Sequence, residues 1–435
     1  MNILYLAHRI PYPPDKGDKL RAFRQIERLA RLHKVWCACF VDSPRDYRHL
    51  PALREYCVDL AAIELRPVIA TGRGMWGLLR GRTVTESYYA SAAMRATVGR
   101  WAGTVGFDAV VAFSSSMAAY ALAAPAGRRI LDLCDRDSQK WLDYSVHSSG
   151  LPRRLYRIEG QRLARCERSW IEAFDASILI TAAEAAPLRN LAASSRLHVV
   201  GNGVLLPALQ PADRDASCGA PELEPLSGMP DGALLPTVGF VGMMNYRANV
   251  DAVRWFVETC WPRIVATHPR AVFRIVGRRP GRSVRRLSRI KGVQVVGGVD
   301  DALDEVRRFD VSVAPMRIAR GLQNKVLEAM AAARPVVLTS RAAEGIEATA
   351  GRDFVIADSP DEIGRCVAEL LSDPSARRRL GESARRYVAQ HHRWNVELDK
   401  FELIVTGATT ASVARATESG RQAPEPHLRL VSTGP

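Results

Sequence analysis

The chain has 435 residues, a hydrophobic content of 47% and a formal net charge of +15. This length exceeds one ordinary core and predicts two domains, while the lack of an apolar run of about 18 residues argues against a membrane-spanning helix. Eight scattered cysteines without a CxxC pair argue against a disulfide framework or a zinc site and favour reduced thiols in the cytoplasm. The positive charge predicts a phosphate-bearing substrate, an anionic membrane or nucleic acid as partner, unless an arginine-rich genome explains it.

Strands and helices alternate through the first half. Short apolar runs predict strands at residues 3–7, 35–41, 61–65, 109–113, 130–133, 177–181 and 199–201, with amphipathic helices such as 18–32 and 155–174 between them. The opening MNILYLAH is typical of a first strand, because its basic residues follow the apolar run and a signal peptide has the reverse order. The alternation predicts a doubly wound parallel sheet over residues 1–204.

A proline- and glycine-rich stretch separates the two halves and predicts a linker over residues 205–235. The second alternating block has expected strands at residues 237–241, 272–276, 293–296, 311–314, 336–339 and 354–357. Residues 236–374 are therefore expected to form a second Rossmann-like domain that faces the first across a cleft. Residues 375–405 are expected to be a helical segment, with helix over about 376–401, and residues 406–435 a disordered tail.

Residues 311–340 predict a strand, a loop, a helix and a further strand. Ligands of parallel sheets bind beyond the carboxyl ends of the strands, at helix N-termini. That position holds a set of polar and small residues: Arg317, Arg320, Gly321, Asn324, Lys325 and, one turn further, Glu328. A cation, an amide and a carboxylate on one helix face suit a ligand with phosphates at one end and a diol at the other, as in a nucleotide-sugar. The alternatives are a Glu328–Lys325 surface pair and, for the two arginines, plain surface charge.

Glycine ends the first strand of the second block. Gly242 removes a side chain where backbone N–H groups could approach a pyrophosphate, although a tight turn would need glycine as well. Arg247 is the nearest cation, and Arg278 follows the next strand, where it could face the cleft. A GxGxxG fingerprint is absent, which disfavours a dinucleotide-dependent oxidoreductase.

Three segments of the chain resemble known glycosyltransferases. GLQNKVLEAMAAARPVV resembles the signature of retaining GT-B glycosyltransferases of family 4. ARGLQNKVLEAM, MNILYLAHRIPYPPDKGDKLRAFRQIERL and DLCDRDSQKW are similar to the sugar transferases of PEP-CTERM/exosortase exopolysaccharide systems. The resemblance covers residues 1 to about 401. It implies an α/β GT-B fold of two Rossmann-like, doubly wound parallel-sheet domains, with the last helix returning to the first domain.

The resemblance also implies a chemistry: retaining transfer from a UDP- or GDP-sugar to a lipid-linked or polysaccharide acceptor, without a cofactor or essential metal. The implied nucleotide-sugar site comprises Gly242, Arg247, Arg278, Gly321, Asn324, Lys325 and Glu328. The family carries two glutamates separated by seven residues. The second glutamate falls on Glu328. The first falls on Arg320, where this chain departs from the family pattern, and Arg320 is expected to be catalytic. Identity of the sugar therefore does not follow from the resemblance.

Further candidates lie in the first half. Gly17 could bring its loop close to the transferred sugar, and Asp18 could serve there or simply cap a helix. Arg21, with Arg24 nearby, could meet an acceptor phosphate. Asp135 and Asp137 superficially match the metal pair of the single-domain GT-A fold. Two alternating halves favour acceptor binding or a local structural role over a metal site. Asp135 and Asp137 are expected to be catalytic, with a carboxylate that orients the acceptor hydroxyl.

The sequence thus predicts a cytoplasmic glycosyltransferase of exopolysaccharide biosynthesis, with contact to the inner face of the cell membrane. The arginine-rich stretch 263–291 is the expected lipid-facing surface. It has no interleaved aromatic residues, which disfavours single-stranded nucleic acid as its ligand. Two alternatives remain at this point: a GT-B nucleotide-sugar epimerase and a basic nucleic-acid-binding protein.

Overall fold

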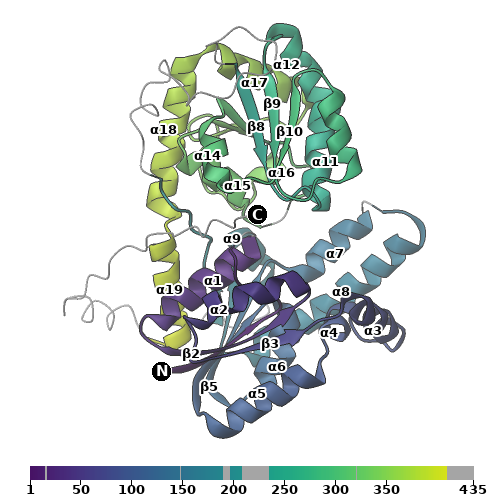
Figure 1. Ribbon diagram of the computed structural model, residues 1–435, viewed down its shortest axis with the longest axis vertical. Coiled ribbons are helices and arrows are strands. Elements are labelled where there is room, and N and C mark those ends of the chain that lie inside the picture. The colour runs from purple at the N-terminus through teal and green to yellow at the C-terminus, as the bar shows by residue number, and fades with distance from the viewer. Residues whose placement is uncertain (15–16, 147, 190–195, 208–234, 320, 409–435) are drawn as a thin grey trace, which may run out of the picture. The chain divides into compact units, whose positions relative to one another are not determined.

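The computed structural model describes residues 1–14, 17–146, 148–189, 196–207, 235–319 and 321–408. The chain divides into two compact units. The first combines Met1–Gly201 with the segment that starts at Asn395, and the second is Asn202–Trp394. Each unit is a β-sheet with helices on both faces (Figure 1). Among the described helices, none combines the length and apolar character that crossing a bilayer would require.

The sheet of the first unit has seven strands in the order β3-β2-β1-β4-β5-β6-β7 over the described residues, all paired in parallel. The strands are β1 (Asn2–Ala7), β2 (Lys34–Val41), β3 (Asp59–Glu64), β4 (Phe107–Phe113), β5 (Ala126–Cys134), β6 (Ala176–Leu179) and β7 (Leu197–Val199). Every strand predicted for this half is present. The largest difference is at β5, which begins at Ala126 and not at residue 130.

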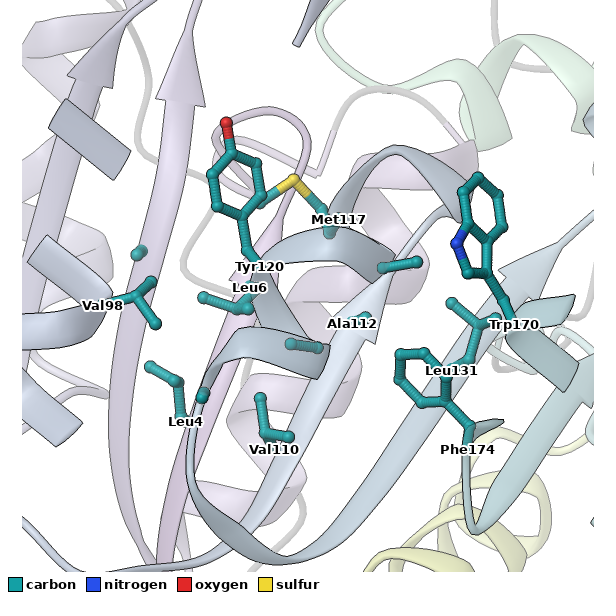
Figure 2. Close-up of a cluster of buried hydrophobic side chains, with 14 of the residues drawn as sticks. Leu4, Leu6, Val98, Val110, Ala112, Met117, Tyr120, Leu131, Trp170 and Phe174 are labelled. Atoms are coloured by element: carbon teal, nitrogen blue, oxygen red, sulfur yellow. The ribbon is translucent and has the colours of Figure 1, made fainter. Parts of the chain in front are cut away.

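The first sheet is covered on both faces because its strands are apolar on both sides. The helices are α1 (Gly17–Ala30), α2 (Leu50–Arg54), α3 (Pro67–Leu79), α4 (Val84–Tyr88), α5 (Ala92–Thr104), α6 (Ala118–Ala123), α7 (Asp137–Val146), α8 (Gly150–Ala173), α9 (Ala182–Ala185) and α19 (Trp394–Thr406). Ile3 and Tyr5 of β1 share a core with α1, α2 and α19. Leu4 and Leu6 point the other way, into the core built with α5, α6 and α8, where Trp170 and Phe174 lie over β5 (Figure 2).

The sheet of the second unit has six described strands in the order β10-β9-β8-β11-β12-β13, again all parallel. The strands are β8 (Thr237–Val241), β9 (Val272–Val276), β10 (Val293–Gly297), β11 (Val311–Ala314), β12 (Val336–Leu338) and β13 (Val355–Ile356). The helices are α11 (Arg247–Trp255), α12 (Trp261–Thr267), α13 (Arg282–Arg285), α14 (Ala302–Arg307), α15 (Asn324–Ala331), α16 (Ser340–Ala343), α17 (Pro360–Ser372) and α18 (Pro374–His391). In Figure 1, α11 and α12 lie on one side of this sheet, and α14 and α15 on the other.

The predicted helical segment over residues 375–405 consists of two helices. The helix α18 ends at His391 and α19 begins at Trp394, so the chain breaks between them. Two backbone contacts explain the break: Arg393 forms a parallel β-bridge with Val204, and Val204 N donates to His392 O at 2.8 Å. These contacts join residues far apart in the sequence and take precedence over local helix propensity.

Both sheets have a topological switch point. In the first, the chain runs from β1 outward to β2 and β3 and then returns to β4 on the opposite side of β1. In the second, it runs from β8 to β9 and β10 and returns to β11 on the opposite side of β8. At such points the loops after the two central strands diverge and leave a crevice at the carboxyl edge, where ligands of open α/β sheets bind. The fold therefore selects the loops after β1 and β4, and after β8 and β11.

Candidate functional site

Glycine lines the carboxyl edge at the switch point of the second sheet. A Cβ atom at Gly242, just after β8, would lie 2.6 Å from Asn249 Nδ2. At Gly277, just after β9, a Cβ atom would lie 1.7 Å from the backbone oxygen of Gly242, and φ is +155°. Only glycine fits at these two positions, because Asn249 and the loop after β8 pack directly against the backbone, and the N–H groups of both glycines donate within the fold, to Val276 O and Gly297 O.

Asn249 and Lys325 meet across this edge. Asn249 is buried in the first turn of α11, where its Nδ2 donates to Met243 O at 3.0 Å and so holds the loop after β8. Its Oδ1 accepts from Lys325 Nζ at 2.6 Å, and Lys325 lies in the first turn of α15, after β11. Since an ammonium can only donate and a carbonyl can only accept, these two partners define the orientation of the amide. The loops on both sides of the switch point are thereby joined at one cation.

The ammonium of Lys325 lies in an apolar surrounding. Its Nζ is 4.8 Å from the centroid of the Phe240 ring and 3.7 Å from Met316 Sδ. Burial lowers the pKa of Lys325 from 10.5 to about 8, although the nearby Glu328 carboxylate opposes the decrease. Among the described residues, this ammonium lacks a full set of hydrogen-bond acceptors, so a bound anion would stabilise its charged form strongly.

Glu328 lies one turn further along α15. Burial raises its pKa from 4.5 to about 7, against the attraction of Lys325, and Asp301 adds to the increase. Among the described side chains, no hydrogen bond or ion pair reaches the Glu328 carboxylate, and Lys325 pairs with Asn249 instead. The surface pair considered above as an alternative is therefore not formed. A half-buried carboxylate without a partner among the described side chains is a candidate for ligand contact.

Both helices that begin at this switch point start without a side-chain cap. Tyr246 precedes α11 and Gln323 precedes α15, and neither side chain accepts a hydrogen bond from its helix. Uncapped N–H groups and the positive end of the helix dipole favour an anion. Asn324, the first residue of α15, accepts at Oδ1 from Asn202 Nδ2 at 3.0 Å, so the start of α15 is held in place.

The remaining candidates of this unit differ in their surroundings. Gly321 has a φ of +60°, the left-handed region that favours glycine, directly before α15. Arg247 and Arg278 are exposed at the start of α11 and after β9. Arg317 is bound elsewhere: its Nε donates to Asp251 Oδ2 at 3.0 Å, its Nη2 to Oδ1, and it lies over Trp255. Arg320 lies outside the described residues.

The switch point of the first sheet collects a second polar group. His8 and Arg9 follow β1 directly, and both contact Asp18 in the first turn of α1: His8 Nε2 lies 3.5 Å and Arg9 Nη1 3.1 Å from Oδ2. Burial alone would raise the pKa of Asp18, but the hydrogen bond from His8 and the charge of Arg9 hold it well below its usual range. His8 Nδ1 is buried and has no hydrogen-bond partner among the described residues.

Asp135 and Asp137 follow β5 at the same edge. Asp137 accepts from Ser115 Oγ at 2.7 Å, which joins the ends of β4 and β5. Asp135 Oδ1 is buried without a hydrogen-bond partner in the described chain. Burial raises the pKa of Asp135 to about 6, Asp137 adds to the increase, and Lys140 opposes it. The two aspartates thus differ: one is held within the fold, and the other is open to a ligand.

Arg21 has partners within the fold. It is 1% exposed, its Nε donates to Asp132 Oδ2 at 2.9 Å, and its Nη1 donates to Gly201 O at 2.9 Å. Gln25 Nε2 donates to the same Asp132 oxygen. This network ties α1 to β5, which is a structural role. Gly17, the first residue of α1, is exposed.

Backbone strain marks the same edges. Four non-glycine residues have positive φ in the described chain, and three of them lie at or just after the carboxyl ends of strands: Ser114 after β4, Cys134 at the end of β5 and Arg279 after β9. Residues held in this region cost free energy and concentrate at functional sites. The geometry therefore points to the same strand ends as the topology.

Sequence reasoning missed two residues. His8 directly follows the first strand, and that position alone could have selected it. Asn249 is the second of these residues and lies near the start of α11. No local signal reveals its role, because its partner Lys325 is 76 residues away and becomes a neighbour only through the strand order.

Comparison with known proteins agrees with this geometry. Residues 235–373, which contain the whole second switch point, match the family model described as Glycosyl transferases group 1. A curated relative, glycosyltransferase 1 domain-containing protein 1 of Xenopus tropicalis, is 24% identical over 123 residues, or 28% of this chain. The chain spans about a third of that relative's length, 35%.

Two solved structures resemble the whole chain. Anabaena HepE in complex with UDP superposes with a TM-score of 0.64 at 13% identity, over 97% of this chain and 100% of HepE, which has also been solved with UDP-glucose. Sucrose-phosphate synthase of Thermosynechococcus elongatus has a TM-score of 0.65 at 15% identity, over 96% of this chain and 100% of the synthase. The chain therefore has the GT-B glycosyltransferase fold, and its second unit carries the group 1 glycosyltransferase match.

Proposed function

We propose that the protein is a glycosyltransferase that takes a sugar from a UDP- or GDP-sugar, bound at the switch point of the second sheet. The observation that carries this proposal is the pair of buried Asn249 and half-buried Lys325, which places an ammonium between two helix N-termini that lack a side-chain cap. A diphosphate fits this arrangement, since it offers the oxygens that the ammonium and the N–H groups lack. The group 1 match over the same residues and the UDP complexes of HepE support it.

In this proposal Glu328 accepts hydrogen bonds from the ribose hydroxyls. Its carboxylate is one turn beyond Lys325 on α15 and has no partner among the described side chains, so a diol would supply the missing hydrogens. Binding of the diphosphate beside Lys325 would also favour the protonated ammonium and thereby raise its pKa. Gly321 and Asn324 would leave the N–H groups at the start of α15 accessible, and Gly242 would let Asn249 lie against the loop after β8. Arg247 and Arg278 would add positive charge at the rim.

We further propose that the departing diphosphate is stabilised by this positive charge, without an essential metal or cofactor, and that the anomeric configuration is retained. Fixed cations and N–H dipoles aimed at the leaving group act where charge develops in the transition state. Retention rests on the resemblance of GLQNKVLEAMAAARPVV to the family signature. It is tested by the anomeric configuration of the product, determined by NMR.

The acceptor would bind at the switch point of the first sheet. Asp135 and His8 each present a buried, unpartnered polar atom in the described chain. Because His8 Nε2 donates to Asp18, Nδ1 of the neutral imidazole is an acceptor, so a hydroxyl can donate either to Asp135 Oδ1 or to His8 Nδ1. Asp135 would then orient the attacking hydroxyl and receive its proton. We propose a lipid-linked or polysaccharide acceptor in exopolysaccharide biosynthesis, with the enzyme in the cytoplasm and in contact with the membrane.

Isothermal titration with UDP and GDP tests the nucleotide half of the proposal. Lys325→Met should weaken diphosphate binding by about 10–150-fold, the loss expected from one or more charge-assisted hydrogen bonds. Lys291→Met is the matched control, because Lys291 is an exposed lysine of the same unit, and it should bind as the wild type does. Equal affinity of K325M and wild type, or binding of neither nucleotide by the wild type, would refute the site.

Product analysis separates the epimerase alternative. A nucleotide-sugar epimerase converts its substrate without an acceptor, whereas a transferase needs one for turnover beyond slow hydrolysis. Tight, salt-dependent binding of oligonucleotides together with no binding of UDP or GDP would instead indicate the nucleic-acid-binding alternative.

A further inference from the structure

The helix α3 presents its apolar side to solvent. Its large apolar residues are exposed: Val68 by 86%, Ile69 by 54%, Met75 by 44%, Trp76 by 57% and Leu79 by 78%. They recur at helical spacing and therefore form one stripe. Scattered single apolar residues are normal on a surface, but five on one face of a 13-residue helix are not.

Three of the four buried residues of α3 are small, namely Ala70, Gly74 and Gly77, and the fourth is Leu78. A Cβ atom at Gly74 would lie 2.9 Å from Val84 Cγ1, and one at Gly77 would lie 1.9 Å from Ser87 Oγ. The glycines let α3 pack closely on α4, so the orientation of the helix is determined by its own sequence. A soluble helix places its bulky apolar residues inward. This helix has the reverse arrangement, which indicates a partner outside the fold.

The helix α8 holds α3 and α4 in place. Arg162 Nη1 donates to Leu78 O at 2.6 Å and to Arg82 O at 3.0 Å, at the C-terminus of α3. Glu159 accepts from the backbone N–H groups of Val84 and Thr85 at the start of α4. Figure 1 shows α3 at the outer edge of the first unit, beside α4 and α8. The apolar stripe is therefore anchored and outward-facing in the fold.

Positive charge surrounds the stripe. Residues 65–85 contain four arginines and no acidic residue. Arg66, Arg80 and Arg82 are exposed, and the guanidinium of Arg80 lies 4.7 Å from the centroid of the Trp76 ring. Arginine and tryptophan beside aliphatic residues are typical of helices that lie in the headgroup region of an anionic membrane. Residues 263–291, by contrast, have only Ile290 as an exposed large apolar residue in the described chain.

We infer that the exposed face of α3 docks on an anionic lipid bilayer and inserts Val68, Trp76 and Leu79 between the headgroups. A second copy of the chain fits less well. One face of this helix measures roughly 20 Å by 10 Å, or about 200 Å², against about 800 Å² per partner in a stable dimer. The inference does not rest on the proposed activity, because it uses no residue of either switch point.

Vesicle co-sedimentation tests the inference, with phosphatidylcholine vesicles that contain or lack phosphatidylglycerol. The wild type should bind the anionic vesicles, and less so as salt rises. The double substitution Val68→Glu and Leu79→Glu should lower the partition coefficient about tenfold or more, because it removes two inserting side chains and adds negative charge. Leu32→Glu is the matched control: Leu32 is 67% exposed after α1, outside the stripe, and should retain binding.

A second measurement does not depend on the folding of the double variant. Brominated lipids should quench part of the wild-type tryptophan emission, and Trp76→Phe should remove that part of the quenching. The inference is overturned if the wild type ignores anionic vesicles, if V68E/L79E binds as the wild type does, or if Trp76→Phe leaves the quenching unchanged. Each variant should bind UDP as the wild type does, because the substituted residues lie outside the nucleotide site. The result with vesicles is therefore independent of the result with UDP.

Discussion

Replacement of Glu328 by glutamine should make the protein more stable at neutral pH and less able to bind a nucleotide-sugar. The pKa of this carboxyl rises from 4.5 to about 7 on folding. Between these values the folded state holds a proton that the unfolded state has released, so stability falls as pH rises through the window and the loss is complete above pH 7. The pKa change corresponds to on the order of 3 kcal/mol.

Glutamine keeps the shape of the side chain and remains neutral, so the variant escapes this loss. The free energy of unfolding of E328Q minus that of the wild type should therefore increase with pH, by about 2 kcal/mol between pH 5.5 and 8. The Lys325 ammonium, with a pKa of about 8, remains mostly protonated over most of this range and contributes little to the slope. Urea unfolding of both proteins across the range measures the difference.

Glu382→Gln is the matched control, since Glu382 is a well-exposed carboxylate on α18 of the same unit. It should change the free energy of unfolding little at any pH. A difference for E328Q that stays constant with pH, or an equal slope for E382Q, would refute the reasoning. A variant that gains stability and loses nucleotide-sugar binding would show that the site is maintained for function at a cost to the fold.

Four further outcomes are expected. Asn249→Asp should lower UDP affinity about tenfold in calorimetry, because a carboxylate competes with the diphosphate for the ammonium it holds. Gly277→Ala should destabilise the second unit by about 3 kcal/mol or more in urea unfolding, whereas Gly281→Ala, with nothing within 4 Å, should not. Arg21→Met should cost about 3–5 kcal/mol of stability, because the buried Asp132 carboxylate loses its cationic partner. A variant of a surface arginine should cost much less. Acceptor kcat/KM should fall about tenfold per pH unit below the pKa of about 6 of Asp135, and Asp135→Asn should flatten that profile.

The sequence predicted the strands well because a buried parallel strand is a short, uninterrupted apolar run. The strands at 237–241, 272–276 and 311–314 were predicted to the residue. Such runs carry their own signal, independent of the neighbours they pair with. The break between α18 and α19 has no such signal in the local sequence, because it depends on contact with Val204, nearly two hundred residues earlier.

The site could be predicted only in part. Local patterns selected Lys325 and Glu328 because a strand, a loop and a helix start are visible in sequence. The alternative of a Glu328–Lys325 surface pair is not formed, since Lys325 binds an asparagine of α11. Arg317 looked like a phosphate ligand, but Asp251 occupies its guanidinium. Partners across a sheet edge follow from strand order, which no single segment encodes.

The contribution of α19 to the first core has a consequence for synthesis on the ribosome. Phe401 and Val405 are fully buried among residues of β1 and α1, yet they are translated after the entire second unit. At about 5–20 residues per second, the growing chain waits roughly 10–40 s between Gly201 and Asn395. During that delay the earlier-made half exposes an uncovered apolar face, so it is the part of the nascent chain most exposed to aggregation and most in need of a chaperone.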